Sequence, residues 1–129
     1  MIFGVTGSRN PRPQDTVARL QALIVQHGVT ELRHGDCVGW DKQAHDAAKA
    51  MGIRTVAHPP SNPSLRAYCD ADEVRDPLPY LDRNKAIVAA CDRLVAAPDR
   101  PEETRSGTWS TVRHAKRVGV KGWVLPWQL

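Results

Sequence analysis

Short apolar segments alternate with segments of helical periodicity along the whole chain. The first apolar segment, residues 2–6, leads into a stretch in which Val17, Leu20 and Ile24 recur at helical spacing. Strands that alternate with helices form parallel sheets, because each helix returns the chain across the sheet. The alternation therefore predicts an α/β fold: a single Rossmann-like domain of residues 1–129, with a mainly parallel sheet of about five strands and helices on both faces.

The remaining predicted elements continue this order. Further strands are expected at residues 31–34, 53–58, 94–97 and 122–126, and helices at 13–27, 40–51, 81–91 and 107–118. Leu81, Val88 and Cys91 are expected on the buried side of the third helix. A proline-rich segment at about 59–80 is expected to be an irregular loop.

Three of the predicted strands run directly into a glycine-bearing turn that opens a helix. Glycine permits close approach of a ligand to the backbone, and a helix N-terminus offers free N–H groups with a positive dipole end. The carboxyl ends of parallel strands meet at one edge, so the turns predict a nucleotide-sized crevice that favours phosphate. Residues expected to contact a ligand all lie in these turns: Gly7, Ser8, Arg9, Gly35, Asp36, Gly39, Trp40, Asp41, Ser106, Gly107, Thr108 and Trp109.

Polar residues of the turns suggest particular contacts. Ser8 offers a hydroxyl and Arg9 a bidentate guanidinium to a phosphate, while Asp36 is placed for a ribose hydroxyl. Ser106 is expected to cap the last of these helices, which leaves the N–H groups of Gly107 and Thr108 for a phosphate.

Two tryptophans and one aspartate of the turns can each be interpreted in two ways. Trp40 and Trp109 follow glycines at helix starts, where an indole either stacks on a base or packs in the core. Asp41 either contacts a ligand or favours the helix start through the dipole.

A metal centre and a nucleophilic cysteine are both disfavoured. His34, Cys37, Asp41 and His45 offer ligand types, but no second paired motif completes a site, and His45 is expected to be a packed histidine. No base near Cys37 in the sequence marks it as a nucleophile. We therefore predict neither a metal nor another cofactor.

Three segments resemble one superfamily. Residues 35–45 carry the spacing of the GxxxGxDxxAH element of the DNA-processing protein DprA, and GVTGSRN at residues 4–10 resembles the opening GSR turn of the same superfamily. Residues 82–115 resemble the RK…PGGxGTxxE region of Lonely Guy (LOG) phosphoribohydrolases. In this order the three motifs resemble the SLOG superfamily, most closely its small YpsA-related members.

The resemblance implies a ribose-phosphate pocket with one altered position. Arg83 aligns with the LOG arginine that supports N-glycosidic cleavage, so it joins the expected ligand-binding residues. The LOG catalytic glutamate falls at Thr111, which cannot act as an acid. Arg83 and Asp41 are therefore the catalytic candidates if the chain is an enzyme. Other acids that remain open as substitutes lie near the crevice or in the long loop: Glu102, Glu103, Asp70, Asp72 and Glu73.

Three functions follow from these motifs. The first is binding of a nucleotide or nucleotide-derived ligand by a sensor, carrier or sequestering protein. The second is N-glycosidic hydrolysis of nucleoside monophosphates, as the LOG resemblance implies. The third is single-stranded DNA binding like that of DprA. Nucleic acid ranks last, because the net charge of +4 is scattered along the chain.

Composition favours a cytoplasmic protein. The three cysteines are odd in number and contain no CxxC pair, as in a chain with reduced thiols. No apolar run approaches the roughly 20 residues of a membrane span, and residues 1–10 lack the features of a signal peptide.

The apolar C-terminal segment, together with the dimers common among SLOG relatives, predicts a homodimer.

Overall fold

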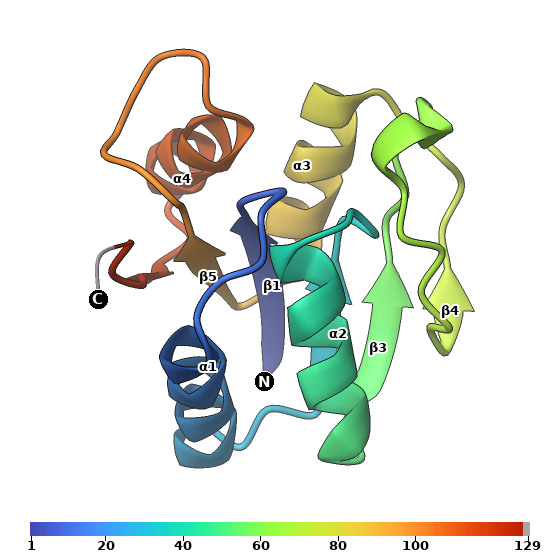
Figure 1. The fold of residues 1–129 in the computed structure, drawn as a ribbon, viewed down its shortest axis with the longest axis vertical. Helices are drawn as coiled ribbons and strands as arrows, with labels where there is room; N and C mark the ends of the chain where they lie inside the picture. The colour runs from blue at the N-terminus through green and yellow to red at the C-terminus, as the bar shows by residue number, and fades with distance from the viewer. Residues whose placement is uncertain (128–129) are drawn as a thin grey trace.

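The computed structural model describes residues 1–127, in which six parallel strands form one sheet in the order β4-β3-β2-β1-β5-β6 (Figure 1). The strands are β1 (Ile2–Gly7), β2 (Glu31–His34), β3 (Arg54–Ala57), β4 (Glu73–Val74), β5 (Arg93–Ala97) and β6 (Gly122–Val124). The helices are α1 (Gln14–Gln26), α2 (Trp40–Ala50), the 3-10 helix η1 (Pro63–Leu65), α3 (Tyr80–Ala90) and α4 (Gly107–Val118). The predicted α/β Rossmann-like class is confirmed, with six strands rather than about five.

Two predictions within residues 59–91 are corrected. The loop expected to be irregular contains β4, whose two residues pair with Val56 and Ala57 and are too few to show a pattern. Leu81 is 61% exposed rather than buried. The reason is that α3 turns Arg83, Ile87 and Val88 toward the sheet, and Leu81 does not lie on this buried face of the helix.

Local signals account for the ends of the helices. In α1, the buried side chains of Val17, Leu20 and Ile24 form one apolar face. Gly28 follows that helix at a φ of +59°, and Gly119 caps α4 at a φ of +84°, both in the left-handed region. None of the helices within residues 1–127 combines the length and the hydropathy of a membrane span.

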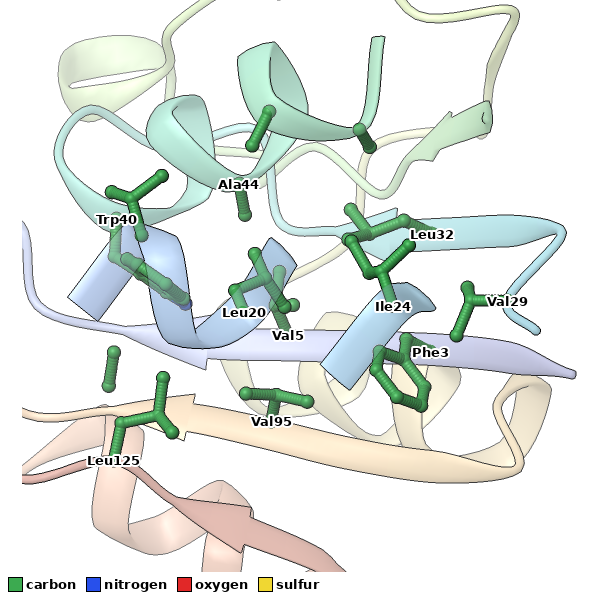
Figure 2. Packing of buried hydrophobic residues seen from close by; sticks show 14 residues of the cluster. Phe3, Val5, Leu20, Ile24, Val29, Leu32, Trp40, Ala44, Val95 and Leu125 are labelled. Atoms are coloured by element: carbon green, nitrogen blue, oxygen red, sulfur yellow. The ribbon is translucent and has the colours of Figure 1, made fainter. Parts of the chain in front are cut away.

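The core lies on both faces of the central strands. Between the sheet and the α1–α2 layer, Phe3, Leu20 and Trp40 are fully buried (Figure 2). On the opposite face, α3 and α4 pack a second cluster that includes Val88 and Val112. The strand order reverses between the central strands β1 and β5, because β1 is followed outward by β2 and β5 is followed outward by β6.

Ion pairs cover the α3-facing side of β2, β3 and β4. Leu32 packs in the α1–α2 core, so its neighbours in β2 face the other way. There, Glu31 lies between Arg33 and Arg54 at 2.9 and 3.1 Å. Glu73 lies between Arg54 and Arg75, at 2.7 Å from each. We call these five residues the ion-pair ladder.

Candidate functional site

A cavity of about 290 Å³ opens at the carboxyl ends of β1 and β5. It is lined by residues 7–10 of the β1–α1 turn, by Asp99, Arg100 and Glu103 after β5, and by residues 105–108 at the start of α4. Since β1 leads toward β2 and β5 toward β6, this is the point where the strand order reverses. Open α/β sheets bind ligands at such points. We call this cavity the crevice.

The start of α4 faces the crevice with free donors. Ser106 caps the helix by accepting a hydrogen bond from the Trp109 N–H at 3.3 Å. Gly107 and Thr108 are the first residues of the helix, so no carbonyl within it accepts from their N–H groups. Open space surrounds the position that a Cβ of Gly107 would take. The helix end is therefore sterically open to an anion.

Three arginines and two carboxylates line the crevice, an excess of one positive charge. Arg100 contacts Asp99 at 2.9 Å and Glu103 at 3.6 Å. Within residues 1–127, Arg9 and Arg105 form no ion pair. The guanidinium of Arg9 instead lies 5.7 Å from the Tyr80 ring centre. Two cations in the crevice thus remain available to an anionic ligand.

Asp99 joins the two turns of the crevice. Its Oδ2 accepts hydrogen bonds from the Ser8 hydroxyl at 2.8 Å and from Asn10 Nδ2 at 3.0 Å. A hydrogen bond from Arg100, with those from Asn10 and Ser8, holds the pKa of Asp99 well below its usual range. The Ser8 hydroxyl, predicted to reach a phosphate, is therefore engaged with Asp99. Sequence reasoning missed Asp99, although its place just after a predicted strand was a usable signal.

A second cavity of about 60 Å³ adjoins the crevice, and we call it the small cavity. Gly7, Arg9, Gly107 and Thr108 line both spaces, so the two are neighbours at the same sheet edge. The small cavity extends toward α2 and α3, whose polar residues close it.

Arg83 is fixed in the wall of the small cavity. Its side chain is 6% exposed, and Nη1 donates to the carbonyls of Gly35 at 2.5 Å and His58 at 3.3 Å. Nε donates to Asn84 at 2.7 Å, and the guanidinium lies 5.3 Å from the Tyr80 ring centre. These contacts hold the charge in one position. Tyr80 and Asn84 were not expected from the sequence.

Asp41 faces Arg83 across Gly35. Asp41 is 7% exposed and lines the small cavity, and its Oδ1 has no hydrogen-bond partner. Burial raises the pKa of this carboxyl to about 6, against the opposing effects of Arg83 and of the backbone N–H groups of Cys37 and Gly35. A Cβ at Gly35 would lie 2.7 Å from Asp41 Oδ2 and 2.5 Å from Arg83 Nη1. Glycine is thus required for both groups to approach the same strand end.

Both tryptophans of the turns are packed, which contradicts the stacking interpretation. Trp40 is fully buried, and a Cβ at Gly7 would overlap its indole. Trp109 is 6% exposed and donates its indole N–H to the Arg100 carbonyl at 3.1 Å. Its ring packs edge-on against Trp127. Neither indole lines the crevice or the small cavity, because the helix starts point these side chains into the core.

Asp36 and Gly39 also serve the fold. Asp36 is 1% exposed, and its oxygens accept from Arg66 and from the Cys69 N–H, each at 2.8 Å. It therefore anchors the long loop and does not line either cavity, contrary to the expected ribose contact. A Cβ at Gly39 would overlap the backbone of Arg9. The N-terminus of α2 thus rests on the first turn, rather than on a ligand.

The histidine pair beneath the site does not fit a metal. His34 Nε2 and His45 Nδ1 are 3.2 Å apart, and Cys69 offers a third ligand atom nearby. However, the Asp36 N–H donates to His34 Nδ1 at 2.9 Å, so the proton of neutral His34 is on Nε2 and points at His45. A metal at Nε2 would require that proton on Nδ1. Burial lowers the pKa of His34, to about 3, and that of His45.

Of the acids considered for catalysis, the structure brings Asp41 and Glu103 to the cavities. Thr111 is 2% exposed and donates its hydroxyl to the Gly107 carbonyl at 2.9 Å, behind the helix end. The remaining acids are paired elsewhere. Their partners are Arg113 for Glu102, Lys49 for Asp70, Thr55 for Asp72, and Arg54 and Arg75 for Glu73.

No protein-family model and no curated protein sequence matches the chain. Solved structures do match. The molybdenum cofactor binding protein of Rippkaea orientalis superposes with a TM-score of 0.73 at 24% identity, over 95% of this chain and 74% of the other. The Moco carrier protein of Chlamydomonas reinhardtii gives 0.72 at 22%, over 96% and 75%. This chain shares the Rossmann-like α/β fold of these structures.

A third similar structure belongs to a longer protein. DNA processing protein A (DprA) of Streptococcus pneumoniae gives a TM-score of 0.71 at 21% identity, over 98% of this chain and 50% of that one. These neighbours confirm the predicted Rossmann-like fold. At such identities the likeness concerns the fold, and function must be argued from the site.

Proposed function

We propose that the chain binds a nucleotide-type small molecule, with its phosphate at the start of α4 in the crevice. The observation that carries this proposal is the open helix end beside Arg9 and Arg105, which have no carboxylate partner within residues 1–127. A helix N-terminus and guanidinium groups both favour a phosphate. Arg100 balances the negative charge of Asp99, so the local charge remains positive.

The structural neighbours support carriage of a small molecule on this fold. Two of them are named as a molybdenum cofactor binding protein and a Moco carrier protein. For this chain we propose a sensor, carrier or sequestering role rather than one particular ligand. We also propose that the chain forms a homodimer and is cytoplasmic.

Calorimetric titration tests the proposal. Wild-type protein is titrated with AMP, ADP-ribose and inorganic phosphate, and we expect at least one nucleotide to bind more tightly than phosphate alone. Arg9→Ala should weaken this binding about tenfold or more, since hydrogen bonds to charged groups contribute strongly. Arg19→Ala, an exposed charge on α1, is the matched control and should leave affinity unchanged. No binding at millimolar nucleotide would overturn the proposal.

A second function has one observation in its favour. The carboxyl of Asp41, with a pKa of about 6, lies in the wall of the small cavity beside Arg83. An acid that titrates near neutral pH suits proton transfer to a leaving base. We therefore propose, as the alternative, N-glycosidic hydrolysis of nucleoside monophosphates.

Chromatography of free base after incubation with nucleoside monophosphates separates the two functions. Release of base that is lost in both Asp41→Asn and Arg83→Ala supports hydrolysis at this site. Base release that persists in both variants assigns the reaction to other residues. Binding without any base release leaves the first proposal as the better one.

A further inference from the structure

Asp41 leaves a buried acceptor without a donor. Its side chain is 93% buried, yet Oδ1 has no hydrogen-bond partner within residues 1–127. Leaving a buried carboxylate oxygen unpaired is costly, and such groups in folded proteins nearly always have a partner. Because Asp41 lines the small cavity, a group that enters this cavity can supply the missing donor.

Arg83 offers the complementary donor in the wall of the same cavity. Its Nη1 and Nε hydrogen bonds go to protein acceptors, and none within residues 1–127 involves Nη2. The Cys37 thiol also lines the cavity and remains neutral, because burial raises its pKa. A ligand group here therefore meets one acceptor and one cationic donor.

This pairing selects for hydroxyl groups. A phosphate oxygen would be repelled by the carboxylate of Asp41, and an ammonium group by Arg83 and Arg9. A hydroxyl both donates and accepts, so it satisfies Asp41 and Arg83 together. The volume of about 60 Å³, against about 290 Å³ for the crevice, suits small polar groups.

The position of the small cavity also favours a part of the ligand that carries hydroxyl groups. Gly107 and Thr108 line both the crevice and the small cavity, so a phosphate at the start of α4 lies next to the entrance. In a nucleoside monophosphate the adjacent part is the sugar. We propose that Asp41 and Arg83 bind the vicinal hydroxyls of a ribose, so that the chain distinguishes ribonucleotides from 2′-deoxyribonucleotides. This inference rests on the proposed nucleotide binding.

A paired ligand series tests the inference. Wild-type protein is titrated calorimetrically with AMP, GMP, CMP and UMP, each beside its 2′-deoxy counterpart. We expect the deoxy form to bind about tenfold more weakly, since it leaves one buried group unpaired. In Asp41→Ala the two forms should bind within about twofold of each other, while Arg19→Ala should keep the wild-type ratio.

The outcomes separate this inference from the proposal beneath it. Equal affinity of ribo- and deoxyribonucleotides for wild type overturns the hydroxyl site and leaves nucleotide binding intact. Full discrimination retained in folded Asp41→Ala overturns the role of Asp41. If no nucleotide of either series binds, the proposed function fails and this inference with it. The wild-type ratio decides the matter even where Asp41→Ala does not fold.

Discussion

The two halves of the sheet are covered in different ways. β5 carries buried apolar side chains on both faces, and β1 lies between α2 on one face and α3 and α4 on the other. β2 and β3 have α2 on one face, and the ion-pair ladder lies on the other face of β2, β3 and β4. Both cavities that we assign to a ligand lie at the end of the helix-covered half. The helix-covered half therefore has both rigid turns and helix N-termini with free N–H groups, whereas the ion-pair ladder provides neither.

The largest expected effect is the loss of a core side chain from the helix-covered half. Leu20 is fully buried, so Leu20→Ala should lower the free energy of unfolding by about 3–5 kcal/mol. Val25→Ala, 72% exposed on the same helix, should cost less than about 0.5 kcal/mol. Urea denaturation measures both. A cost below about 1 kcal/mol for Leu20→Ala would mean that the helix layer does not carry the stability.

Asp41 should make stability fall as the pH rises from about 4 to 6. Its pKa is about 6 in the folded protein and 3.8 when unperturbed, so the folded state binds the proton more tightly. The folded state thus loses stability as pH rises from about 4 through 6. Relative to wild type, the free energy of unfolding of Asp41→Asn should rise by about 1–2 kcal/mol between pH 4 and pH 8. Denaturant titrations at the two pH values measure the gain, and an equal difference at both would contradict the buried charge.

His58 should act in the opposite direction. Burial, with the charges of Arg33 and Arg75, lowers its pKa to about 4, so the unfolded chain takes up the proton first. Stability is complete above pH 6.5 and is lost as pH falls toward 4. His58→Gln keeps an acceptor for Arg33 and should lose about 1 kcal/mol less than wild type between pH 7 and pH 5. Parallel pH profiles of the two proteins would refute this.

The smallest expected effect comes from the ion-pair ladder. Arg54 bridges Glu31 and Glu73 with its side chain 49% exposed, so Arg54→Met should cost less than about 1 kcal/mol. Salt at 0.5 M should reduce the cost further, because it screens exposed pairs. Thermal denaturation at two salt concentrations measures this. A salt-independent loss as large as that of Leu20→Ala would erase the contrast between the two halves.

The same contrast explains which features the sequence could predict. Helices α1 and α4 carry clear apolar spacing and end signals, and the turns at Gly7 and Gly107 follow recognisable strands. The ladder could not be predicted, because Glu31, Arg54 and Glu73 meet only through sheet pairing.

Sequence reasoning located the turns of the site, but it did not show which of their residues line the cavities and which stabilise the fold. Gly35, Asp41 and Arg83 meet around the small cavity, which spacing alone could not show since Arg83 comes from a distant helix. Asp36 and Asp41 are both acidic and lie in the same turn. Only the fold shows that the long loop occupies Asp36 and leaves Asp41 with a free oxygen.

The pairing of β1 with β5 has a kinetic consequence. It joins Phe3 to Arg93 and Gly7 to Ala97, partners about 90 residues apart in the chain. Such closures are slow, since the entropy of the long loop is lost before the contacts form. During synthesis, β1 keeps one edge unpaired until residue 97 has emerged. We therefore expect the crevice to be among the last parts of the molecule to assemble, and the nascent chain to be most prone to aggregate just before then.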